Sequence, residues 1–139
     1  MASSIHFAEL CFLGASLTAV LLGALLQRQH LRECPRIAAD VHMYEFKGFV
    51  RLQMYLTILA LAAMIPALLL LFRRTFFGDG FDPIQGLVWL LPYIVLFAFS
   101  LMIKRKGIKV RDVNRCDEKY REDFAHVSFV WRKKVFPNF

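Results

Sequence analysis

The chain has few cysteines and few charged residues for its length. Its 139 residues include three cysteines, and 21% of the residues are charged. So few cysteines exclude a disulfide-built scaffold, and a hydrophobic content of 58% excludes a disordered chain. A soluble domain is disfavoured as well, because about 45–50% apolar residues is usual even when glycine is counted. The mean hydropathy of +0.46 agrees with this interpretation.

The sequence also lacks the short motifs of common soluble active sites. It contains no glycine-rich phosphate loop, no GxGxxG and no GxSxG. It has no CxxC and no HxxxH pair. His30 with Cys34, and Cys116 with His126, could supply ligands in principle, but without such a pair to anchor them they do not predict a metal site. We therefore expect no metal site and no complete active site of a soluble type.

Long uncharged runs are the main feature of the chain. Residues 52–72 and 84–103 contain no charged residue, and residues 5–27 contain only Glu9. A helix needs about 20 residues to cross the hydrocarbon core of a bilayer, and each run reaches that length. We predict an all-α integral membrane protein with three transmembrane helices in residues 1–103, followed by a basic cytoplasmic tail in residues 104–139.

The basic residues are distributed unevenly around these runs. Of the 18 lysines and arginines, only Arg73 and Arg74 lie between the second and third runs. Because basic loops stay on the cytoplasmic side, we predict the N-terminus outside and the C-terminus inside. The protein would then be a multi-pass protein of the bacterial inner membrane, the mitochondrial inner membrane or the endoplasmic reticulum. Cys34 and Cys116 would lie on the reducing side, so no disulfide is expected.

Two segments outside the runs show helical periodicity. Ile37, Val41 and Tyr44 predict a short interfacial helix before the second run. In the tail, apolar residues recur at steps of three and four and predict one continuous amphipathic interfacial helix. The members of this stripe are Val113, Cys116, Tyr120, Phe124, Val127 and Trp131.

Polar and small residues within the runs are the candidate functional positions. His6 and Glu9 share one helix face, and an ionisable group inside a membrane is a candidate for proton or ion chemistry or for a hydrogen bond with a partner. Small residues at helical spacing allow close helix packing. They form one row in the first run, Ala15, Ala19 and Gly23, and another in the second, Ala63 and Ala67.

The last third of the chain carries a recognisable pattern. It reads LLPY at 90–93, RDVNRCDEKYREDF at 111–124, and Pro137 near the end. This pattern resembles the C-terminal segment of the membrane sterol reductases of the delta-7 and delta-14 type, and more loosely that of isoprenylcysteine methyltransferases. The resemblance implies that Arg111, Asp112, Cys116 and Tyr120 lie on the NADPH side. Phe124 and Arg121 stand where the reductases have tryptophan and glycine.

These patterns leave three hypotheses for function. The first is a small non-catalytic integral membrane subunit or assembly factor of a larger assembly, such as a respiratory complex. It would dock through its small-residue faces and its basic tail, with no cofactor. Its partners would be membrane lipids and other membrane subunits or a further copy, and not nucleic acid. The second is an NADPH-dependent sterol-reductase-like, or methyltransferase-like, membrane enzyme. The third is a small transporter or ion-pathway component that uses Glu9 and His6.

Overall fold

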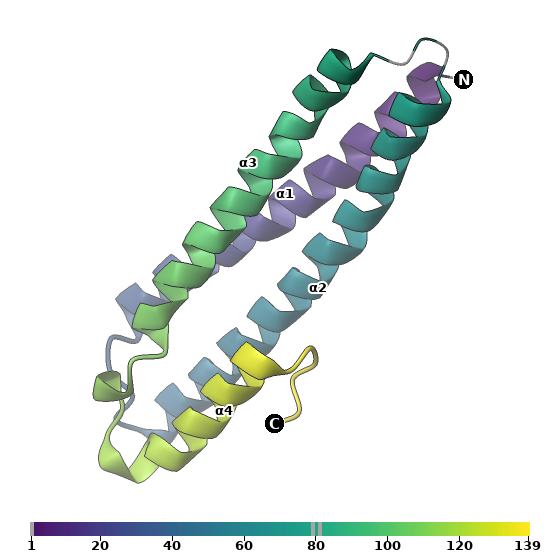
Figure 1. Cartoon of the computed structure of the whole chain (residues 1–139). Helices are drawn as coiled ribbons and strands as arrows, with labels where there is room; N and C mark the ends of the chain where they lie inside the picture. Colours follow the sequence, from purple (N-terminus) through teal and green to yellow (C-terminus); the bar gives the residue numbers. More distant parts are fainter. Residues whose placement is uncertain (1, 79, 81) are drawn as a thin grey trace.

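Three long helices and one short helix make up the chain (Figure 1). The structure, a computed structural model, describes residues 2–78, 80 and 82–139, without the side chains of residues 2, 3 and 5. The elements in chain order are α1 (Ala2–Glu33), α2 (Asp40–Phe77), α3 (Pro83–Val110), the 3₁₀ turns η1 (Val113–Arg115) and η2 (Glu118–Tyr120), and α4 (Arg121–Lys133).

The structure confirms three long apolar helices at the positions that the sequence predicts. Each of α1, α2 and α3 is long and apolar enough to cross a membrane, and the uncharged runs lie inside them. Their ends follow local signals. Helix α1 ends at Glu33, two residues before Pro35, which cannot continue a helix. Helix α3 begins at Pro83, where the Asp82 carboxylate accepts the Ile84 N–H at 3.0 Å.

The prediction of a separate interfacial helix before the second run is wrong. Residues 40–51 belong to α2, which is continuous over 38 residues and thus about 57 Å long. Ile37 precedes this helix, while Val41 and Tyr44 point outward with exposures of 63% and 76%. The buried face consists of Met43, Phe46, Phe49 and Val50. Other elements of the chain cover that face, so tertiary packing accounts for its burial.

The prediction of one continuous helix through the tail is also wrong. Two 3₁₀ turns come first, and α4 begins only at Arg121. Between the turns, Cys116 forms a parallel β-bridge with Ile37. The Ile37 N–H donates to the Arg115 carbonyl at 2.7 Å, and the Asp117 N–H donates to the Ile37 carbonyl at 3.0 Å. An amide used in this bridge is not available for a helical hydrogen bond, so the helical periodicity is interrupted at this point.

Helices α1 and α2 make the most extensive contact among the described helices. Two buried hydrogen bonds join them, from Ser16 Oγ to the Ala60 carbonyl at 2.9 Å and from Gln53 Nε2 to the Gly23 carbonyl at 2.8 Å. Of the predicted small-residue rows, Ala19, Gly23, Ala63 and Ala67 are buried, whereas Ala15 is exposed. The buried members belong to the packing within this chain, because small residues let the two backbones approach.

Gly23 should tolerate replacement less well than Gly14 on the same helix. A Cβ atom added at Gly23 would lie 3.3 Å from Gln53 Oε1, whereas one at Gly14 on the same helix would meet nothing within 4 Å. We expect Gly23→Leu to reduce the free energy of unfolding by about 1–3 kcal/mol through overpacking. Gly14→Leu should leave it nearly unchanged. Thermal unfolding in mild detergent measures both, and equal effects would contradict this interpretation.

The two ends of the bundle differ in what they contain. The N-terminal end holds the start of α1 and the connection between α2 and α3, and the α4 end holds the α1–α2 connection and the tail (Figure 1). At the α4 end, α4 lies beside the first half of α2 and buries Phe124, Val127 and Val130. Each fully buried side chain of this kind contributes about 1.5–3 kcal/mol. The tail is therefore packed against the helices rather than extended from them.

Candidate functional site

A buried carboxylate joins the three long helices near the N-terminal end. Glu9 of α1 is 1% exposed. Its Oε1 accepts a hydrogen bond from the Tyr93 hydroxyl of α3 at 3.1 Å, and its Oε2 lies 3.2 Å from Arg74 Nη2 of α2. A single side chain thus contacts both neighbouring helices. Removal of either charged partner would leave the other charge in the bundle without compensation.

Two aromatic rings complete the arrangement, which we call the Glu9 cluster: His6, Glu9, Arg74, Trp89 and Tyr93. The Arg74 guanidinium lies 4.4 Å from the centroid of the Trp89 ring. The His6 ring meets the same tryptophan edge-on at 4.7 Å. A cation over an indole face is stabilised by the negative charge of that face, so Trp89 is a second partner of Arg74 besides the carboxylate.

The Glu9 cluster is not fully saturated with hydrogen bonds. His6 Nδ1, Glu9 Oε2 and Arg74 Nε are buried without a hydrogen-bond partner, although Oε2 stays within ion-pair distance of Arg74. His6 Nδ1 and Glu9 Oε2 are 3.8 Å apart. The cluster therefore cross-links three helices, while His6 Nδ1 and Glu9 Oε2 lie near each other without a hydrogen bond.

Sequence reasoning singled out His6 and Glu9 but not Arg74, Trp89 or Tyr93 as site residues. One signal for Arg74 was available: a buried carboxylate requires a cation, and only Arg73 and Arg74 are basic at that end of the chain. No comparable signal pointed to Tyr93, because an aromatic residue in an apolar run is ordinary membrane sequence.

The four residues that the reductase resemblance implies all lie where α3 leads into the tail. Arg111 donates to the Gly107 carbonyl at 3.3 Å and lies 5.4 Å from the Trp131 ring centroid. Asp112 accepts the Asn114 N–H at 3.0 Å. Cys116 belongs to the bridge with Ile37, and the Tyr120 hydroxyl donates to Asp40 Oδ1 at 2.8 Å. Each of the four therefore has a partner within the chain.

Burial and neighbouring side chains raise the pKa of three groups in this region. Burial raises the pKa of the Cys116 thiol, and the nearby Asp117 carboxylate adds to the shift. Burial also raises the pKa of the Cys34 thiol, against an opposing effect of Arg115. The hydrogen bond to Asp40 raises the pKa of the Tyr120 hydroxyl. All three groups are held in their neutral forms, which suits packing better than nucleophilic chemistry.

Arg115 is the residue at this end that sequence reasoning missed as a site residue. Its Nη1 donates to the Val110 carbonyl at 2.7 Å, its Nε donates to the Pro35 carbonyl at 3.1 Å, and its Nη2 donates to the Cys34 carbonyl. One guanidinium thereby ties the end of α3 to the α1–α2 connection. We call Arg115, the Ile37–Cys116 bridge, and the pairs Arg36–Asp117 and Tyr120–Asp40 the tail clamp.

No group of three or more potential metal ligands converges in the part of the chain that the structure describes. His30 and Cys34 are both buried at the α4 end. The His30 ring stacks on the Phe49 ring, with centroids 4.4 Å apart and planes 7° apart. These two residues serve as core side chains.

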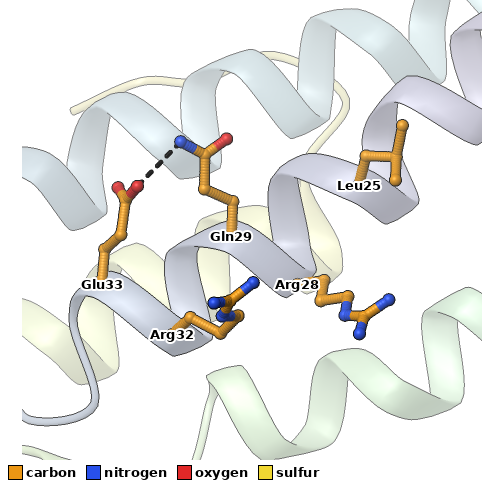
Figure 2. Close-up of a pocket in the computed structure, with 5 residues that line it drawn as sticks. All are labelled: Leu25, Arg28, Gln29, Arg32 and Glu33. Atoms are coloured by element: carbon orange, nitrogen blue, oxygen red, sulfur yellow. Dashed lines mark hydrogen bonds between the residues drawn. The ribbon is translucent and has the colours of Figure 1, made fainter.

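Two hollows lie near the ends of α1 and α3. One, of about 630 Å³, runs along the last turns of α1 and is lined by Leu25, Arg28, Gln29, Arg32 and Glu33 (Figure 2). The other, of about 280 Å³, runs along the end of α3 and is lined by Leu101, Lys104, Arg105, Ile108 and Arg111. Each combines apolar and basic side chains.

Comparison with known proteins adds no assignment to this geometry. No protein-family model, no curated protein and no solved structure matches the chain.

Proposed function

We propose that this chain is a small, non-catalytic integral membrane subunit or assembly factor of a larger membrane complex. The observation that carries the proposal is how its buried polar groups are used. Glu9, Ser16 and Gln53 each bond to a neighbouring helix. Polar groups used in this way hold helices together in a membrane and are not free to bind a substrate.

The shape of the hollows supports the same proposal. A site that encloses a small molecule takes its walls from several elements. The hollow at Leu25–Glu33 is lined by α1 alone, and the other is lined by α3 and the residue that follows it. Open grooves along single helices favour contact with lipid or protein over catalysis.

The proposed docking surface is the outer face of α3. Only 11% of the apolar window of α3 is buried, against 22% for α1 and for α2. Leu87, Leu91 and Ile94 follow one face and are each more than half exposed. Because the small residues of α1 and α2 pack against each other, α3 is the helix with most surface left for a partner helix. The basic tail would add contacts at the α4 end.

In this proposal the N-terminal end lies outside, and the α4 end lies on the cytoplasmic or equivalent side. The supporting observation is charge: Arg73 and Arg74 are the only lysines or arginines in residues 52–103. Arg74 is also used in the Glu9 cluster, which leaves Arg73 as the free cation among the described residues of that end.

The test is purification of the tagged chain in mild detergent, followed by native mass spectrometry. We expect a complex of fixed stoichiometry. The variant Leu87→Ala/Leu91→Ala/Ile94→Ala should lose the partner. A matched variant on the exposed face of α2, Leu61→Ala/Ile65→Ala/Leu69→Ala, should keep it. The α2 variant removes the same type of surface from a different helix.

Two outcomes would contradict the proposal. One is a chain that runs as a lone monomer before any substitution is made. The other is saturable binding of NADPH or S-adenosylmethionine by the purified protein, which would favour the enzyme that the tail resembles. In that case Arg111 and Tyr120 would have to exchange their present partners for the cofactor.

A further inference from the structure

Arg28 and Arg32 form a pair of cations without an acidic partner. They are one helical turn apart on α1, and both are exposed. Figure 2 shows them on one side of α1, with Gln29 and Glu33 on the other side. Gln29 Nε2 donates to Glu33 Oε1 at 2.9 Å, so the nearest carboxylate is directed away from both arginines. Neither guanidinium has an ion-pair partner within the described residues.

Helix α3 brings further cations to the same level of the bundle. A Cβ atom added at Gly107 would lie 3.8 Å from Gln27 Nε2, so α3 passes next to α1 one residue before Arg28. Lys104 and Arg105 line the hollow on α3, and both are exposed. Among the described residues, four cations without an ion-pair partner thus lie near the ends of α1 and α3: Arg28 and Arg32 in the hollow on α1, and Lys104 and Arg105 in the hollow on α3.

Apolar side chains lie on the membrane side of these cations. Leu25, which is 63% exposed, comes one turn before Arg28 and Gln29 in the hollow on α1. Leu101 comes one turn before Arg105 in the hollow on α3. Each hollow starts in the uncharged run of its own helix and ends in the basic segment that follows that run. This order, apolar and then basic, matches a phospholipid whose chains lie in the core and whose phosphate lies at its edge.

We infer that the ends of α1 and α3 bind the headgroup of an anionic phospholipid, held by Arg28 and Arg32 together with Lys104 and Arg105. Arginine grips a phosphate with two parallel hydrogen bonds, and Arg28 and Arg32 are spaced to share one group. The acyl chains lie along Leu25 and Leu101. A free phosphate would use only the cations and would leave the apolar part of each hollow without a role.

The test uses the delipidated full chain in detergent and two probes, phosphatidylglycerol and phosphatidylcholine. Native mass spectrometry counts bound lipid, and a titration gives the affinity. We expect phosphatidylglycerol to bind at one per chain and phosphatidylcholine to bind at least tenfold more weakly. Each basic side chain near a headgroup contributes about fivefold, so Arg28→Gln/Arg32→Gln should weaken phosphatidylglycerol binding about 30-fold.

The control is Arg73→Gln, which removes an exposed cation from the N-terminal end. It should leave phosphatidylglycerol binding unchanged. Because all three arginines are exposed, thermal unfolding should show that the variants keep the stability of the parent chain. Equal binding of the two lipids would overturn the inference, as would equal effects of Arg28→Gln/Arg32→Gln and Arg73→Gln. If inorganic phosphate binds as tightly as phosphatidylglycerol, the inference that a lipid occupies the site is wrong.

Discussion

Replacement of Glu9 by alanine lowers the free energy of unfolding by about 3–5 kcal/mol, the usual effect of removing one partner from a buried ion pair. The carboxylate is 1% exposed and is the common partner of Arg74 and Tyr93. Without it, the Arg74 guanidinium keeps, among the described residues, only the Trp89 face as a partner. Reversible unfolding in mild detergent measures the change.

A double-mutant cycle separates the ion pair from other effects of the substitution. Arg74→Ala alone should also destabilise the protein, but Glu9→Ala/Arg74→Ala should cost less than the sum of the two, since neither charge is then left unpaired. We expect a coupling free energy of at least about 1 kcal/mol. Glu45→Ala is the matched control, because Glu45 is exposed on α2. An effect of Glu9→Ala as small as that of Glu45→Ala would contradict the role of the Glu9 cluster.

The ion-pathway hypothesis makes a different prediction for the same position. If a proton or ion passes through Glu9 and His6, Glu9→Gln abolishes transport in proteoliposomes. A structural cross-link predicts no transport in the parent chain and a loss of stability in the variant. The two atoms that face each other, His6 Nδ1 and Glu9 Oε2, are 3.8 Å apart, so they are the pair to test.

Replacement of Arg115 by alanine opens the tail clamp and lowers the free energy of unfolding by about 2–4 kcal/mol, because each partly buried carbonyl left without its donor costs about 1–3 kcal/mol. The contacts to the Cys34 and Val110 carbonyls are partly buried, whereas the contact to the Pro35 carbonyl is exposed and adds little. Arg115→Lys should recover little of this loss, since one ammonium group cannot reproduce the planar fork of a guanidinium.

Hydrogen exchange reports on the clamp directly. The Ile37 and Asp117 amides donate the two hydrogen bonds of the β-bridge. In Arg115→Ala they should exchange at least about 30-fold faster, which corresponds to about 2 kcal/mol. Arg36→Ala is the matched control, because Arg36 joins the same segments through Asp117 but its side chain is 70% exposed. A surface pair of this kind contributes about 0–1 kcal/mol. Equal exchange in both variants would contradict the assigned role of Arg115.

The positions of the three long helices were predictable because they depend on local properties of the chain. An uncharged run of about 20 residues is apolar wherever it lies, and Pro35 and Asp82-Pro83 mark helix ends by their own geometry. The two segments predicted wrongly, 37–50 and 113–131, are those whose apolar periodicity was interpreted without knowledge of what covers them. Ile37 and Cys116 pair with each other, and this pairing replaces the helix expected around each of them.

The candidate site also has one part that the sequence predicts and another that only the tertiary structure determines. That Glu9 is unusual followed from the sequence by itself, because a carboxylate in an apolar run is costly wherever the run packs. Its partners were decided only by the tertiary structure: Arg74 is 65 residues away and Tyr93 is 84 residues away. The three carbonyls bound by Arg115 depend in the same way on the meeting of α3 with the α1–α2 connection. Apolar length is a property of one segment, whereas an ion pair or a clamp is a property of two or three segments brought together by folding.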